Sequence, residues 1–155
     1  MVVRVIVILA IAVIGVGVYL LVGGGDDRDD SGEIEEEGEV SVFDLRVNDC
    51  LTDLPEGEGE QTSIKATPCD KPHEAQVFTI IDLGGGDYPG NEVVSGKARR
   101  GCPARLRRLK PAVEVGLYNF QPTEESWDSR DDHSISCIAV YEKPVTGLLK
   151  DQKKT

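Results

Sequence analysis

Residues 75–83 have the sequence AQVFTIIDL, which is the strongest strand signal in the chain. Valine, isoleucine, phenylalanine and threonine dominate it, and these residues suit the pleated, partly buried surface of a sheet. Residues 133–142, HSISCIAVYE, alternate at first, with Ile135 and Cys137 on one face, and then become fully apolar. The two segments predict buried strands at the centre of the fold.

Two further strands are expected on the N-terminal side of this pair. Residues 42–48, VFDLRVN, alternate with a period of two and predict a half-buried strand that ends near Cys50. Residues 61–67 predict a short strand. Residues 53–61 and 84–90 contain the glycines and prolines that favour loops.

One helix, broken by a proline, is expected between the two central strands. Asn91 can cap its start. The residues of its apolar face are four apart: Val94, Ala98 and Cys102. Pro103 removes a backbone donor and disfavours helix at the residue before it, which predicts a break there. A second helical piece would cover residues 103–110, with Leu106 and Leu109 on its apolar side.

The order of these elements is strand, strand, strand, helix, strand. It predicts an α+β domain, in which a small antiparallel sheet is covered by one Pro-broken helix. Residues 111–130 are predicted to be irregular, and residues 144–155 to form a tail. The domain would extend over residues 42–149, with residues 150–155 after it.

The N-terminal residues favour a membrane span. Residues 5–22 are 18 consecutive residues without a charge, and a helix of that length is about 27 Å long, close to the hydrocarbon thickness of a bilayer. Arg4 precedes this segment and acidic residues follow it. We therefore expect a single-pass anchor over residues 1–22, with a cytoplasmic N-terminus and an extracytoplasmic domain. A cleaved signal peptide is the alternative, and it would export the domain as well.

The next segment, residues 23–41, is strongly acidic. It contains nine acidic residues and one arginine, and accounts for most of the net charge of −11. Such a composition predicts a disordered linker, with a calcium-binding or partner-binding tail as the alternative. The domain itself is only mildly acidic, and aromatic residues make up 5% of the chain. No nucleic-acid partner is therefore expected.

The predicted domain contains four cysteines, namely Cys50, Cys69, Cys102 and Cys137. An even number in an exported domain favours two disulfides, and the sequence allows three pairings. We favour Cys50–Cys69, which closes a short polar loop, and Cys102–Cys137, which joins the helix to a strand. The alternatives are a zinc site that adds His73 and His133, and a reactive thiol beside a histidine. The chain has no C-x-x-C pair, and no cofactor is expected.

Two single residues are candidates for contact with a partner. His73 follows Pro72 at the entrance to a strand, where it could act as a base or a pH-sensitive contact, or simply hold the turn. Trp127, the one tryptophan, could stack on sugar rings or belong to the core. Asp131 and Asp132 lie close to it in the sequence. Together with His73, these carboxylates define an alternative in which the chain is a cell-wall-modifying enzyme.

Basic residues are concentrated on the predicted helix. Residues 93–113 contain no acidic residue and seven basic ones: Lys97, Arg99, Arg100, Arg105, Arg107, Arg108 and Lys110. Spread around a helix, such residues are often only a solvated face. They are also typical of a surface that binds lipid head groups, an anionic envelope polymer or an acidic protein. The acidic linker of the same chain is a further candidate for this surface.

Several motifs resemble the septum formation family of actinobacterial membrane-associated domains, over about residues 42–149. The motifs are Val42-Phe43-Asp44-Leu45, Val47-x-Asp49-Cys50, Pro68-Cys69-x-x-Pro72-His73-x-x-x-Val77, Tyr88-Pro89-Gly90, Cys102, Trp127, Cys137 and Thr146-Gly147. The resemblance implies a membrane segment, an extracytoplasmic domain with two disulfides, and a link to the division septum. The family often carries a glycine near the position of Asp131, so the turn in this chain departs from its pattern.

These observations predict a non-enzymatic, membrane-tethered interaction domain that acts in the cell envelope, in septum formation and cell division. Its expected contact surfaces are His73, Trp127 and the basic helix. The alternative is a cell-wall-modifying enzyme or a metal-binding domain that uses His73 and the pair Asp131–Asp132.

Overall fold

A computed structural model describes residues 28–29, 31–55 and 61–153. Their elements, in chain order, are β1 (Gly38–Ser41), η1 (Val42–Asp44), β2 (Cys50–Thr52), β3 (Ser63–Thr67), β4 (His73–Asp82), α2 (Asn91–Leu109), β5 (Gly116–Phe120), α3 (Glu124–Arg130), β6 (Ser134–Val145) and η2 (Leu149–Asp151). The described strands form one six-stranded sheet in the order β1-β3-β2-β4-β6-β5, and every pairing is antiparallel. The predicted α+β class and antiparallel sheet are confirmed.

The strands β4 and β6 form the centre of the sheet, as the apolar segments predicted. Their register runs from His73 opposite Val145 to Asp82 opposite Ser134, with an irregularity between Val77 and Thr79. A bulge bends a strand and shifts the side-chain alternation. Each face of the sheet carries its own apolar cluster, one with β1, β2 and β3 and the other beneath α2.

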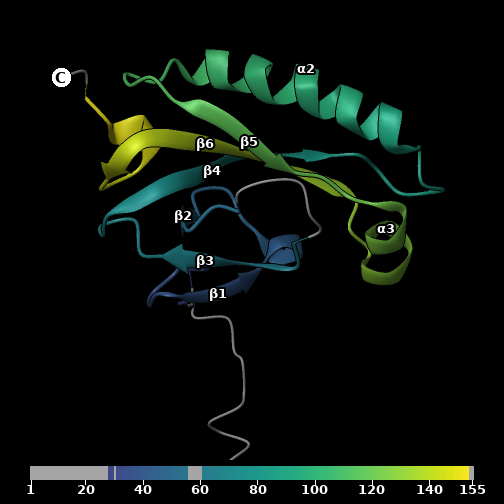
Figure 1. The fold of residues 1–155 in the computed structure, drawn as a ribbon, viewed down its shortest axis with the longest axis horizontal. Coiled ribbons are helices and arrows are strands. Elements are labelled where there is room, and N and C mark those ends of the chain that lie inside the picture. Colours follow the sequence, from purple (N-terminus) through teal and green to yellow (C-terminus); the bar gives the residue numbers. More distant parts are fainter. Residues whose placement is uncertain (1–27, 30, 56–60, 154–155) are drawn as a thin grey trace, which may run out of the picture.

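Helix α2 covers the face formed by β4, β5 and β6 (Figure 1). The predicted apolar face is present, because Val94, Ala98 and Cys102 are all buried. Gly101 permits this close packing, since a Cβ there would lie against the side chain of Ile81.

The predicted break at Pro103 is wrong, since α2 continues through it without interruption. Arg99, whose carbonyl loses its helical donor there, is exposed, so water can take the donor's place. Cys102, immediately before the proline, is bonded to β6 and holds the helix on the sheet. The start of the helix also differs, because Gly90 is the N-cap and Asn91 the first helical residue. Leu109, expected on the apolar side, is exposed.

The N-terminal boundary of the domain was predicted too late. The segment 42–48 is not a strand, because η1 occupies its first three residues, and the edge strand β1 lies in the predicted linker. Val40 in β1 and Ile34 before it are buried, so they supply core residues that the acidic composition concealed. Arg28 forms an isolated bridge with Ile34. The described part of the linker is therefore folded onto the domain.

The C-terminal half contains two elements where irregular chain was predicted. β5 and α3 both lie within residues 111–130. Thr123 caps α3 by accepting a hydrogen bond from the backbone N–H of Ser126, whose hydroxyl in turn accepts from the N–H of Thr123. The predicted tail also has structure: β6 continues to Val145, and η2 is held because the N–H of Leu149 donates to Gln76.

Both predicted disulfides are present. Cys50–Cys69 joins β2 to the turn before β4, and Cys102–Cys137 joins α2 to β6. No described residue is a free cysteine. Among the described residues no helix has the length and apolarity to cross a bilayer. The predicted membrane span at residues 5–22 lies outside the described residues.

Candidate functional site

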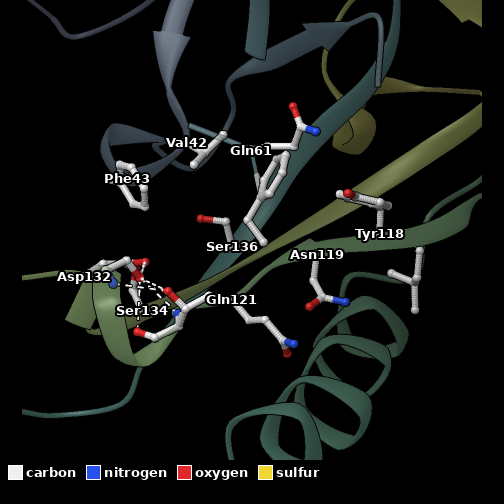
Figure 2. A pocket seen from close by; sticks show the side chains of 13 residues that line it. Val42, Phe43, Gln61, Tyr118, Asn119, Gln121, Asp132, Ser134 and Ser136 are labelled. Carbon is white, nitrogen blue, oxygen red and sulfur yellow. Dashed lines mark hydrogen bonds between the residues drawn. The ribbon is translucent and has the colours of Figure 1, made fainter. Parts of the chain in front are cut away.

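A pocket of about 620 Å³ opens on the face of the sheet opposite α2. Such a volume is within the range of small-molecule sites. Residues from four regions line it: Val42 and Phe43 of η1, Gln61 before β3, residues 117–121 at β5, and Thr123, Ser126, Asp132, Ser134 and Ser136 from α3 to β6. Figure 2 shows η1 and β5 on opposite sides of this space.

Aromatic rings form part of the pocket wall. Tyr118 and Phe120 are two residues apart in β5, so both side chains are on the same face, and their rings meet edge to face with centroids 5.3 Å apart. Phe43 faces them from η1, with the guanidinium of Arg130 5.0 Å from its ring centroid. All three rings are half-buried and in contact with the apolar core on this side.

The rest of the lining is polar and almost uncharged. Asp132 is the one charged side chain among the described lining residues. It accepts a hydrogen bond from the Ser126 hydroxyl at 3.1 Å. Burial raises the pKa of Asp132, and this effect exceeds the opposing effect of its hydrogen bonds. The pocket therefore contains one carboxylate in a partly desolvated position, and no basic side chain is among its described lining residues.

A second pocket of about 460 Å³ adjoins the first along β5. Leu117 and Tyr118 line both pockets, and Leu54 and Pro55 form part of the far wall of the second. The two spaces therefore follow the length of β5 on the same side of the sheet.

The basic residues of α2 lie on the side of the molecule away from this pocket. The helix contains six of them and a single acidic residue, Glu92. Five are exposed, and Arg105 is half-buried. None of the six forms an ion pair with a described residue. The surface predicted to meet an anionic partner is therefore present as one exposed, uncompensated face.

The described part of the acidic linker does not lie against the basic side chains of α2. Residues 33–37 lead into β1, which is the edge of the sheet farthest from β5. Figure 1 shows β1 and α2 at opposite sides of the molecule. The prediction that the linker occupies the basic surface of its own chain is wrong for this part of the linker.

His73 and Trp127 are both buried and offer no surface to a partner. His73 has no exposed area; its Nδ1 lies 2.9 Å from the Lys71 carbonyl oxygen, and its ring meets Tyr141 edge to face. The indole N–H of Trp127 donates to the Gly86 carbonyl at 2.8 Å and fixes the glycine-rich loop. His73 therefore fits the interpretation in which it holds the turn before β4, and Trp127 fits the one in which it belongs to the core.

The residues of the alternative enzyme site are far apart. His73 begins β4, whereas Asp131 and Asp132 lie just before the start of β6, which pairs with the end of β4. β4 has 10 residues, so its ends are about 30 Å apart. These three side chains cannot act on one bond.

The metal alternative finds no support among the described residues. All four cysteines are bonded in pairs, which leaves no thiolate to bind zinc or to act as a nucleophile. No described cluster of three or more histidine, cysteine or acidic residues could hold an ion. His133 lies 3.7 Å from Asp131, a pair that is largely at the surface.

The pocket residues were missed because β5 was not predicted. The segment Gly116–Phe120 is only five residues long and lies between prolines, which favoured irregular chain. The signal that could have found it is the alternation of Tyr118 and Phe120 with Leu117 and Asn119. Comparisons with protein-family models, curated proteins and solved structures find no match. The resemblance to the septum formation family therefore rests on the motifs quoted above.

Proposed function

We propose that this chain is a membrane-tethered, extracytoplasmic interaction domain of the cell envelope that acts by binding rather than by turnover. In this proposal the exposed side of α2 binds an anionic polymer of the envelope. The single observation that carries it is the set of basic side chains on α2 that have no ion pair among the described residues. The resemblance to the septum formation family supports a place of action at the division septum.

The chemistry of the helix favours a phosphate- or carboxylate-bearing partner. Five of its six basic residues are arginines. The guanidinium group binds such anions through two parallel hydrogen bonds, which a lysine cannot do. Because the side chains are exposed, the attraction is expected to weaken as salt is added.

The position of the helix favours a polymer over the lipid of the chain's own membrane. Residues 23–27, between the predicted span and Arg28, extend at most about 18 Å. They would hold the Arg28 side of the domain near the bilayer. Arg28 bridges to Ile34, which belongs to the apolar cluster on one face of the sheet, whereas α2 covers the cluster on the other face. The basic surface would then face away from the membrane.

Charge reversal on the exposed side of α2 tests this proposal. Full-length protein in detergent is titrated with polyphosphate and with polygalacturonate, and dextran is the uncharged control. The variant Arg100→Glu, Arg107→Glu, Arg108→Glu is expected to lose at least tenfold in affinity for the anionic polymers. A matched variant, Lys71→Glu, Lys143→Glu, Lys150→Glu, has the same change in net charge on other exposed residues and is expected to bind nearly as the wild type does.

Equal loss in both variants would show that net charge alone governs binding and would refute the role of α2. Binding to vesicles with anionic head groups in preference to both polymers would assign the surface to lipid instead. Capture of an acidic protein with neither polymer bound would equally refute the polymer proposal.

A further inference from the structure

The pocket opposite α2 contains a hydroxyl that has no hydrogen-bond partner among the described residues. It belongs to Ser136, a residue that is 5% exposed and lies third in the central strand β6. Its hydroxyl makes no hydrogen bond with a described residue. Figure 2 shows it in the middle of the pocket, between Phe43 and Tyr118, with no dashed line to a neighbour.

This hydroxyl is open to the pocket, since it is not among the described buried polar atoms that lack a partner. Water can satisfy it in the free protein, and a ligand that displaces this water must replace its hydrogen bond. On this face of β6 the neighbours of Ser136 are Ser134 on one side and, on the other, Ile138 and Val140 of the core cluster. Ser136 therefore lies where the polar part of the pocket meets the apolar core.

Other polar groups around Ser136 are free as well. The amide of Gln61 and the hydroxyl of Ser134 make no side-chain hydrogen bond with described residues, whereas Asn119 alternates with Tyr118 and points toward α2 (Figure 2). An amide can both donate and accept, and so can a hydroxyl. The pocket thus presents mixed donors and acceptors around the side chain of Ser136.

The charge and polarity of the lining residues determine which kind of ligand the pocket favours. An anion would meet the carboxylate of Asp132, and the nearest described guanidinium, that of Arg130, lies against the ring of Phe43 and is not itself a lining residue. A purely apolar ligand would leave Ser136 and the amide of Gln61 unsatisfied, which lowers affinity strongly. A neutral ligand rich in hydroxyl groups satisfies them, and its C–H groups can pack on the negative faces of Phe43 and Tyr118.

We propose that this pocket binds a neutral oligosaccharide, with the Ser136 hydroxyl bound to a sugar hydroxyl and the rings of Phe43 and Tyr118 against the flat side of a sugar. The adjoining pocket along β5 gives room for further sugar units. A peptide fits less well, because a peptide strand adds to a sheet through the backbone of its open edge. β5, an open edge strand, also lines the pocket, but Ser136 lies on β6, a strand already paired on both sides, so a peptide added to the edge of β5 would not reach it.

The test titrates full-length protein in detergent with cellotriose, maltotriose and chitotriose, followed by calorimetry and by ligand-observed NMR. At least one trisaccharide is expected to bind with a dissociation constant of about 1 mM or tighter. Trialanine amide and trigalacturonate, which are of similar size, are expected not to bind. The α2 variant with three charge reversals is expected to keep the wild-type affinity, so this site and the proposed function can fail separately.

The decisive variant is Ser136→Ala, which is expected to weaken trisaccharide binding about tenfold, the loss of one hydrogen bond. Its thermal midpoint is expected to stay close to that of the wild type, which would show that the loss is not an unfolding effect. Ser63→Ala, at an exposed position of β3, is the matched control and should bind as the wild type does. The proposal is overturned if no trisaccharide binds at its highest soluble concentration, if the tripeptide binds instead, or if Ser136→Ala keeps full affinity.

Discussion

Asp49 fixes the N-terminal segment to the sheet. Its two carboxylate oxygens accept hydrogen bonds from the two guanidinium nitrogens of Arg28, each at 2.8 Å, and one of them also accepts from the N–H of Arg46 at 2.7 Å. The side chains of Arg28 and Asp49 are 3% and 4% exposed. A single carboxylate therefore joins residues 21 positions apart in the sequence.

We predict that Asp49→Ala lowers the free energy of unfolding by about 3–5 kcal/mol, because Arg28 loses its buried carboxylate. Replacing both partners with apolar residues, Arg28→Met with Asp49→Leu, is expected to recover most of that loss. Urea unfolding of the two variants and the wild type measures the difference. The interpretation is wrong if the double variant is as unstable as the single one.

At the scale of the element, α2 ends in a conformation that suits glycine better than its own residue. Lys110, the C-cap, has φ 51° and ψ 55°, in the left-handed region. A residue with a Cβ is strained there, and helices commonly place glycine at such an end. Asp131 at the end of α3 has φ 56°, and the resembling family often has a glycine near that position.

We predict that Lys110→Gly raises the free energy of unfolding by about 0.5–1 kcal/mol, since glycine relieves the left-handed strain. Arg108→Gly, two residues earlier and inside the helix, is the control and is expected to lower stability by about 1 kcal/mol. Denaturant titration of both variants measures whether each substitution raises or lowers the free energy of unfolding. Destabilisation of similar size in both would show that Lys110 is not strained.

The best predicted elements are those with long apolar patterns. β4, β6 and the apolar face of α2 follow from the apolar pattern of their segments, and β3 was predicted only as a short strand over residues 61–67. The irregular pattern Val77, Phe78, Ile80, Ile81 reflects the register shift in β4, since Val77 and Ile80 face one core and Phe78 and Ile81 the other. A pattern of period two cannot locate such a shift, because it depends on the partner strand.

The short elements were missed for a different physical reason. β1 has four residues in an acidic context, and η1 occupies an alternating segment that forms a turn instead of a strand. Their conformations are set by pairing with β3 and by burial of Val40 and Val42, which are contacts distant in the sequence. The pocket depends on β5, η1 and β6 together, so its residues could not be grouped from the sequence.

At the scale of the whole molecule, the two disulfides stabilise different halves of the sheet. Cys50–Cys69 closes a separation of 19 residues beside β2, whereas Cys102–Cys137 closes 35 and attaches α2. The longer loop restricts the unfolded chain more. The second bridge also holds α2 directly before Pro103, where the helix lacks a backbone hydrogen bond.

We predict that Cys102→Ala with Cys137→Ala lowers the free energy of unfolding by about 4 kcal/mol. Cys50→Ala with Cys69→Ala, the matched control, is expected to lower it by about 3 kcal/mol. Equilibrium unfolding in urea, followed by circular dichroism, measures the free energy of unfolding of each variant and shows which is less stable. The opposite order would mean that the polar loop, and not the attachment of α2, limits stability.

The contact between Arg28 and Asp49 also determines how the domain carries mechanical tension. A pull on the N-terminal end of the chain reaches Arg28 before it reaches β1, and passes through Asp49 to its neighbour Cys50. Cys50 is covalently bonded to Cys69, so the load enters a cross-linked part of the sheet. The hydrogen bonds between β1 and β3 are then not the first to bear it. A protein anchored by its N-terminus, with its far side attached to a wall, would resist being peeled apart from the edge strand.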